Sequence, residues 1–328
     1  MLIVIGIRMP EKTNLFAGIR NLLIRMFLVP IEKWLLKSPS LAAGGFSPPV
    51  FVIGPPRSGT TLLYQALVHR FNFIYLTNFS SKFFMAPLIG TWLAHLRGAF
   101  AARKGNGYTS DYGKTGSPDG PSESGEFWYR WFPRGLQIYV PPKATNPKNI
   151  EELRRQVAGI SKKFNAPMIF KNTYNSMRIA PIMEAFPEAV FIVCQRDPLD
   201  IAQSILTGRI TRNGNKQDWW SVPPKEIEEI KEHPYWEHIP EQVYYIYKQI
   251  ESDSRLYGLQ HFLNVSYREL CETPGATLES IRIFLKARGV ELTIKNEAPE
   301  RFEYSTGIKS DDENYDLLQK KVNELWRA

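Results

Sequence analysis

The sequence predicts an α/β protein with a P-loop three-layer fold, in which helices flank a central parallel sheet. The first observation is the apolar run Val50-Phe51-Val52-Ile53, which ends at Gly54 and is typical of a buried strand. The second is that further apolar runs at residues 168–170 and 190–194 enclose a stretch with helical spacing, residues 176–186. Strands that alternate with helices predict a parallel sheet covered by helices. With 328 residues, 43% of them hydrophobic, the chain is long enough to bury such a core.

Residues 1–45 are predicted to form an amphipathic helical segment ahead of the main domain at residues 46–328. Its apolar stripe comprises Leu15, Phe16, Ile19, Leu22, Leu23, Met26 and Phe27. Basic residues interrupt the apolar run before it reaches the length of a membrane span, at Arg8, Arg20, Arg25 and Lys33. Such a stripe either packs on its own domain, which is the interpretation the pattern favours, or makes peripheral contact with a membrane through residues 12–37.

The rest of the chain continues the pattern of loops, helices and short strands. Residues 103–125 are rich in Gly, Ser, Asp and Lys, which predicts a long surface loop, either a lid or a disordered stretch. Residues 218–240 alternate aromatic and proline residues with charged ones, and either pack as a plain aromatic cluster or line an acceptor pocket. Helices are expected near residues 240–257, 276–288 and 313–326, with a strand at 262–265.

Composition limits the classes of partner. The net charge of +8 favours a polyanionic partner, such as an acidic membrane surface or a phosphate-bearing ligand. The basic residues are dispersed and no single-strand-binding motif accompanies them, which disfavours nucleic acid. Two cysteines and five histidines without ligand spacing predict neither a disulfide framework nor a metal site. We expect a cytoplasmic protein, with membrane association left open by the amphipathic helix; the sequence does not predict an oligomeric state.

The segment from Gly54 to Thr61, with the sequence GPPRSGTT, joins the first predicted strand to a helix. Glycines that bracket four residues before a helix N-terminus turn backbone N–H groups toward an anion, so this loop predicts phosphate binding. A nucleoside triphosphatase would carry Lys after the second glycine, where this chain has Thr60. The basic side chain lies earlier, at Arg57, which argues against Mg²⁺-assisted ATP chemistry and leaves a P-loop kinase as the second choice.

A second anion-binding pattern follows the strand at 190–194. Arg196 ends that strand, and Asp197 and Pro198 are an N-cap and a first-turn proline for the next helix. Ser204 lies about two turns along this helix. Together Arg196 and Ser204 can hold one phosphate, the arginine by charge-assisted hydrogen bonds and the serine by its hydroxyl.

With both motifs present, the sequence resembles the sulfotransferases that use 3′-phosphoadenosine 5′-phosphosulfate (PAPS), in particular the bacterial and tyrosylprotein branch. PPRSGTT is similar to their 5′-phosphosulfate loop, QRDPLDIAQS to their 3′-phosphate motif, and the segment from Val265 to Leu270 to their Tyr-Glu-Asp-Leu segment. The resemblance covers roughly residues 46–290. It implies that PAPS is the co-substrate, adenosine 3′,5′-bisphosphate the product, and that no metal is needed. The residues it assigns to PAPS are Arg57, Ser58, Gly59, Thr60, Thr61, Arg196, Ser204 and Tyr267.

The catalytic base is where the sequence departs from the family. Lys171-Asn172-Thr173 stands where cytosolic members have Lys-x-His, and residues 75–80 lack the carboxylate of heparan-type members. The candidates are Glu123, which a Pro-x-Glu segment of related bacterial sequences favours, then Glu126 and His69; either carboxylate could instead be an exposed loop residue. Lys171, after a predicted strand, is the second cation expected near the transferred group, unless it is simply solvated. The family's C-terminal 3′-phosphate element is not evident.

The acceptor is expected to be a small or lipid-like molecule that offers a hydroxyl or an amine. A non-enzymatic alternative is a catalytically inactive protein on the same fold that binds membrane surfaces peripherally. The net charge and the uncertain base motivate this alternative.

Overall fold

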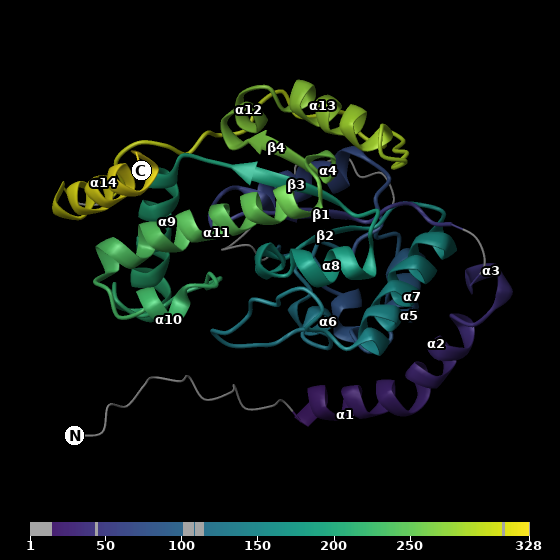
Figure 1. Cartoon of the computed structure of the whole chain (residues 1–328). Coiled ribbons are helices and arrows are strands. Elements are labelled where there is room, and N and C mark those ends of the chain that lie inside the picture. The colour runs from purple at the N-terminus through teal and green to yellow at the C-terminus, as the bar shows by residue number, and fades with distance from the viewer. Residues whose placement is uncertain (1–14, 43–44, 101–107, 109–114, 310–311, 328) are drawn as a thin grey trace, which may run out of the picture.

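The structure is a computed structural model that describes residues 15–42, 45–100, 108, 115–309 and 312–327. In this part of the chain four parallel strands form one sheet in the order β2-β1-β3-β4 (Figure 1). Their bounds are Val50–Ile53 for β1, Ile169–Lys171 for β2, Val190–Gln195 for β3 and Phe262–Ser266 for β4. Val50 pairs with Ile169 of β2 on one side and with Val190 of β3 on the other. The strands predicted from apolar runs are therefore the strands of the sheet.

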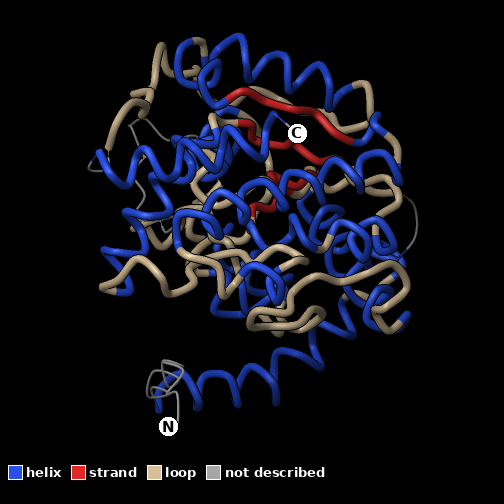
Figure 2. Tube along the Cα trace, turned by 60° about the vertical axis from the view of Figure 1, so that its left-hand side comes forward, coloured by secondary structure: helices blue, strands red, loops and turns tan. Residues whose placement is uncertain are grey.

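Successive residues of the buried strands point to opposite faces, and each face has its own helices. Phe51 and Ile53 of β1 pack into a core with α7 (Pro147–Phe164), α8 (Ile179–Ala185) and α11 (Tyr235–Tyr257). Val50 and Val52 pack on the other face with α4 (Thr60–Arg70), α12 (Tyr267–Glu272) and α13 (Pro274–Lys286). Figure 2 shows the strands enclosed between these helices. The predicted three-layer α/β fold is confirmed.

A third apolar cluster lies beside the sheet and includes the C-terminal helix. Ile201 and Ile205 of α9 (Pro198–Asn213), Ile239 and Val243 of α11, and Leu318 of α14 (Asp312–Arg327) form it. The C-terminal helix is therefore built into the same body as the sheet.

Smaller elements connect these layers. They are α3 (Pro39–Ala42), α5 (Pro87–Leu96), α6 (Gly125–Trp128), α10 (Ile227–Ile230) and the short 3₁₀ turns Ser80–Phe83, Thr173–Met177 and Leu259–His261. The stretch predicted as one helix at 176–186 is divided at Arg178 between the 3₁₀ turn that ends at Met177 and α8. Of the loop predicted at 103–125, residues 103–107 and 109–114 lie outside the described residues.

The described part of the N-terminal segment is helical, but its packing differs from the interpretation that the sequence favours. Helix α1 (Leu15–Leu23) continues through the π-helical turn Ile24–Leu28 into α2 (Val29–Leu35). The described side chains of the predicted stripe, from Ile19 to Phe27, are 49–58% exposed and do not pack on the domain. Ile24 and Leu36 are buried instead, because they lie in a different row of the helix, which faces α5 and α7. No helix among the described residues is both long and apolar enough to cross a bilayer.

Candidate active site

The loop after β1 has the backbone shape of an anion cradle. Gly54 and Gly59 have φ of 146° and 99°, and Arg57 between them has φ of 68°. A Cβ atom at Gly59 would lie 2.2 Å from Cδ2 of Tyr267, so only glycine fits both the backbone angle and the space. Gly59 is the N-cap of α4, whose first-turn N–H groups have no partner within the helix and carry the positive end of its dipole.

Buried hydroxyls hold this loop in place from below. Ser58, fully buried, donates through Oγ to the carbonyl of Pro55 at 2.8 Å. Gly54 donates its N–H to Oγ of Ser176 at 3.1 Å, and that hydroxyl lies 3.2 Å from the Gly54 carbonyl. Ser58 therefore supports the loop, and its side chain does not line the cavity above it.

All four strands deliver side chains to this same edge of the sheet. The loop follows β1, Lys171 ends β2, Arg196 comes directly after β3, and Tyr267 comes directly after β4. The carboxyl ends of parallel strands meet at one edge of a sheet. In this sheet β1 lies between β2 and β3, so the connections that leave β1 and later return run to opposite sides of it. The carboxyl edge at such a point is the usual position of the ligand in open α/β sheets. A cavity of about 540 Å³ opens here, lined by Pro56, Arg57, Gly59, Thr60, Thr61, Leu62, Glu123, Lys171, Thr173, Tyr174, Arg196, Trp220, Ser221 and Tyr267.

The two predicted phosphate motifs are in direct contact beside this cavity, whose lining includes Arg57 and Arg196 but not Ser204. Arg57 Nε donates to Oγ of Ser204 at 2.9 Å, and Arg196 Nη1 donates to the carbonyl of Arg57 at 2.9 Å. The guanidinium of Arg196 also lies over the ring of Tyr267, 4.6 Å from its centroid. Arg196 Nε is buried and has no hydrogen-bond partner among the described residues, so it has a donor to offer an anion.

A third basic side chain joins this cluster from the C-terminal segment, which sequence reasoning missed. Arg196 Nη2 donates to the carbonyl of Ser305, and Lys309 Nζ lies 2.6 Å from Ser305 Oγ. Burial and the charges of Arg196 and Arg57 lower the pKa of Lys309, while Asp200 opposes them. Gly307, with a φ of 87°, turns the chain just before Lys309, and no periodic pattern in the sequence marks this segment. The basic cluster therefore includes a residue outside the two predicted motifs, Lys309.

The opposite side of the cavity holds an ion pair between two of the predicted catalytic residues. Lys171 Nζ donates to Oε1 of Glu123, and Asn172 Nδ2 donates to the Glu123 carbonyl at 3.0 Å. Lys171 is buried, whereas the side chain of Glu123 is 35% exposed and accessible from the cavity. Trp220 and Ser221 line the same cavity, so the aromatic segment at 218–240 contributes to it.

The other two candidates for the base lie elsewhere. Glu126, in the first turn of α6, pairs with Arg134 on the surface and does not line the cavity. His69 is in the last turn of α4, with its ring against Tyr108, and α4 begins at the loop. Burial, together with the charge of Lys295, lowers the pKa of His69. The structure thus brings Glu123 to the loop and leaves Glu126 and His69 away from it.

One group of potential metal ligands occurs in the described part of the chain, at His233, Glu237 and Glu241. It lies outside the cavity. Lys321 Nζ is 3.2 Å from Glu241 Oε1 and 3.7 Å from Glu237 Oε2, so an ammonium group already supplies the positive charge between these carboxylates.

A glycine-bracketed loop at the carboxyl edge of a parallel sheet, with arginines gathered around it, is an arrangement typical of proteins that bind phosphorylated ligands. The family model of the sulfotransferase family matches residues 48–290. The chain belongs to this family, and the resemblance noted in the sequence is confirmed.

The solved structures that match this chain in a structural comparison include three bacterial proteins. The sulfotransferase STF9 of Mycobacterium avium is 16% identical, with a TM-score of 0.49, and the match covers 80% of this chain and 71% of that one. The sulfotransferase domain of the olefin synthase of Synechococcus PCC 7002 is 18% identical, with a TM-score of 0.40 and coverage of 74% and 75%. The sulfotransferase STF1 of Mycobacterium tuberculosis H37Rv is 11% identical, with a TM-score of 0.44 and coverage of 94% and 86%. A search of curated proteins finds no significant match.

Proposed function

We propose that this protein transfers a sulfuryl group from PAPS to a hydroxyl or amine of a small or lipid-like acceptor. The observation that carries the proposal is that one cavity combines a helix N-terminal anion cradle with two arginines, Arg57 and Arg196. Lys309 adds a third positive charge next to Arg196, outside the residues that line the cavity. A nucleotide with phosphates on both its 5′ and 3′ positions offers an anion to each of these features.

The two features take different parts of the donor. The N–H groups at the start of α4 would bind the 5′-phosphosulfate. Arg196 and Ser204, with Lys309 beside them, would bind the 3′-phosphate. The ring of Tyr267, which lines the cavity next to Arg196, would contact the adenine. Arg57 contacts Ser204 and follows the loop prolines, so it is positioned to bridge the two ends of the donor.

The transfer itself forms one bond and breaks one. The acceptor oxygen or nitrogen attacks sulfur, the bond from sulfur to the bridging phosphate oxygen breaks, and the electron pair remains on adenosine 3′,5′-bisphosphate. Glu123 takes the acceptor proton, since it is the carboxylate that faces the cavity. Arg57 stabilises the growing negative charge but does not donate a proton, because arginine stays protonated in proteins.

The ion pair between Lys171 and Glu123 is compatible with the proposed role of Glu123 as the base. In the free enzyme the buried ammonium holds the carboxylate at the cavity wall. When the donor is bound, Lys171 faces two anions, the carboxylate and the sulfuryl oxygens. It can therefore stabilise the transferred group without leaving Glu123, which keeps both catalytic side chains ordered.

Nucleotide binding tests the donor half of the proposal. We expect the protein to bind adenosine 3′,5′-bisphosphate without Mg²⁺, measured by calorimetry, and Arg196→Ala to weaken binding by about 10- to 100-fold, because charged hydrogen bonds are each worth about 1.5–3 kcal/mol. Arg282→Ala is the matched control, since Arg282 is paired with Glu279 on the surface of α13. Binding of ATP that requires Mg²⁺ would instead favour a P-loop kinase. Failure to bind either nucleotide would contradict both the sulfotransferase and the kinase interpretation.

Transfer tests the acceptor half. The protein is incubated with sulfur-labelled PAPS and an extract of lipids and metabolites, and the labelled products are identified by mass. A labelled product that requires the protein and is lost in Arg196→Ala supports the proposal. Nucleotide binding with no labelled product from any fraction would favour the inactive binding protein on the same fold.

A further inference from the structure

The N-terminal arm, residues 15–37, presents two distinct rows of side chains. One row, spaced four residues apart, consists of Ile24, Leu28, Glu32 and Leu36 and faces the domain. The other row is the predicted apolar stripe, extended by Ile31 and Trp34, and it is exposed along its described length. Both Figure 1 and Figure 2 show α1 lying outside the body of the molecule. The arm is therefore attached by one face and leaves an apolar face uncovered.

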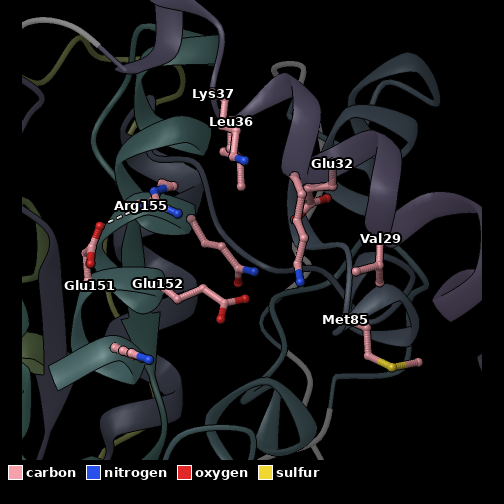
Figure 3. Close-up of a pocket in the computed structure, with 11 residues that line it drawn as sticks. Val29, Glu32, Leu36, Lys37, Met85, Glu151, Glu152 and Arg155 are labelled. Atoms are coloured by element: carbon pink, nitrogen blue, oxygen red, sulfur yellow. Dashed lines mark hydrogen bonds and ion pairs between the residues drawn. The ribbon is translucent and has the colours of Figure 1, made fainter. Parts of the chain in front are cut away.

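The attachment of the arm is specific. Leu36 packs against α7 where a Cβ at Gly159 would come within 2.2 Å of it. Ile24 packs with Ala86 and Ile89 at α5. Glu32 Oε2 accepts a hydrogen bond from the N–H of Ile89 at 3.0 Å, in the first turn of α5. Figure 3 shows Glu32 on α2, and Leu36 just after the end of α2, across a pocket from Glu151 and Arg155 on α7. These contacts fix which face of the arm turns outward.

The outward face carries charge of one sign only. Exposed or half-exposed basic residues, namely Arg20, Arg25, Lys33 and Lys37, accompany the apolar stripe. Glu32 is the sole acidic residue among the side chains described in the arm, and it is buried in the attachment. Trp34, at the end of the stripe, is 72% exposed, and indole rings favour the boundary between lipid and water.

We propose that the arm binds the surface of a bilayer that contains anionic lipid, with its apolar stripe inserted at the boundary between headgroups and acyl chains. An amphipathic helix with an apolar face and only basic exposed charges is suited to this partner. A second copy of the chain fits less well, because a two-fold contact through this face would place the basic residues of the two arms together. The proposal is independent of the sulfuryl-transfer chemistry.

Flotation of the full-length protein with vesicles tests the proposal. We expect binding to vesicles of phosphatidylcholine with phosphatidylglycerol, weaker binding to phosphatidylcholine alone, and loss of binding as salt is raised, since salt screens surface charge. Met26→Ser combined with Phe27→Ser removes two side chains that are each 58% exposed and should weaken binding about tenfold or more. The matched control is Leu256→Ser with Leu259→Ser, which removes exposed apolar side chains from another surface and should bind as the parent does.

Two further measurements identify the occupant. Brominated lipid should quench part of the tryptophan emission of the parent, and this part should be missing in Trp34→Phe. Arg25→Glu with Lys33→Glu should reduce binding to the anionic vesicles and flatten its salt dependence. The proposal is overturned if the parent binds no vesicles, or if the Met26 and Phe27 variant binds as well as its control. It is also overturned if light scattering shows a dimer in solution that the Met26 and Phe27 variant dissociates, because the stripe is then covered by a second copy.

Discussion

Two glutamates three residues apart, Glu123 and Glu126, are candidates for the catalytic base. Glu123 and Glu126 are both polar residues of the same segment, and the sequence offers each as a base. The structure distinguishes them by their partners: Glu123 pairs with Lys171 in the cavity, and Glu126 pairs with Arg134 at the surface. Of the two, Glu123 lines the cavity beside the glycine-bracketed loop and Glu126 does not.

We therefore expect Glu123→Gln to lower kcat for sulfuryl transfer about 10²- to 10⁴-fold, the range usual for loss of a general base. The affinity for adenosine 3′,5′-bisphosphate should stay within a few-fold of the parent, because Glu123 lies on the acceptor side. Glu126→Gln is the control and should keep parental kcat and KM. A large loss of kcat in Glu126→Gln, or parental kcat in Glu123→Gln, would contradict the assignment; thermal unfolding of each variant checks that Lys171 remains accommodated.

At this scale the sequence predicts residues that form local motifs and misses those that do not. Arg57, Arg196 and Ser204 stand at fixed positions relative to a strand and a helix, so their side chains could be predicted to converge. Ser305 and Lys309 reach Arg196 through a segment without regular structure. No periodic pattern in the sequence connects these two residues to Arg196, which is why the contribution of Lys309 to the cluster was not predicted.

The contact between α2 and α5 buries an acid at a helix N-terminus. Burial raises the pKa of Glu32 to about 8, against an ordinary value of 4.5, although the hydrogen bonds from Ile89 and Leu88 and the charge of Arg130 act in the opposite direction. The folded protein therefore holds a proton on Glu32 over a range of pH in which the unfolded chain has lost it. Because the folded state binds more protons, the free energy of unfolding falls as pH rises.

We expect this group to lower the free energy of unfolding by roughly 1.4 kcal/mol per pH unit between pH 4.5 and 8, with the stabilisation complete below that window and lost above it. Glu32→Gln should remove this share of the slope, because the amide stays neutral throughout. Denaturant titrations at pH 5 and pH 8 measure the difference. Glu151→Gln, at an exposed position that lines the same pocket, should keep the parental slope; the same slope in Glu32→Gln and the parent would refute the buried acid.

Elements were predicted well where a single periodicity was present and poorly where two competed. The strands and the helices α13 and α14 follow one clear pattern, and the structure has them within a few residues of the predicted bounds. The N-terminal arm has two apolar rows, and the row with more apolar residues was expected to face the domain. The choice is made by α5 and α7, which accept the row of Ile24 and Leu36. A helix considered alone does not contain that information.

The molecule as a whole links its C-terminal helix to the candidate active site. Gln203 of α9 donates through Nε2 to the carbonyl of Gly307 at 3.2 Å and accepts the N–H of Lys309 through Oε1 at 2.8 Å. Helix α14 begins a few residues later and packs through Leu318 against α9 and α11. The helix that carries Ser204 is thus also the support for Lys309. The alternation of strands and helices predicts the sheet and the edge where a ligand binds. It does not predict that the segment of Gly307 and Lys309 packs against α9, because this contact joins elements far apart in the sequence.

This arrangement predicts that packing of α14 controls nucleotide affinity. Leu318→Ala should cost about 2–5 kcal/mol of stability, as expected for a fully buried leucine, and should weaken binding of adenosine 3′,5′-bisphosphate as the segment before α14 loosens. Leu153→Ala in α7 is the control, since Leu153 is equally buried but lies in the core on one face of the sheet, away from this segment. Calorimetry well below the unfolding temperature of both variants separates the two effects. Equal loss of affinity in the two variants would mean that general destabilisation, and not the support of Lys309, governs the site; unchanged affinity in Leu318→Ala would mean that Gln203 alone is enough to hold the segment.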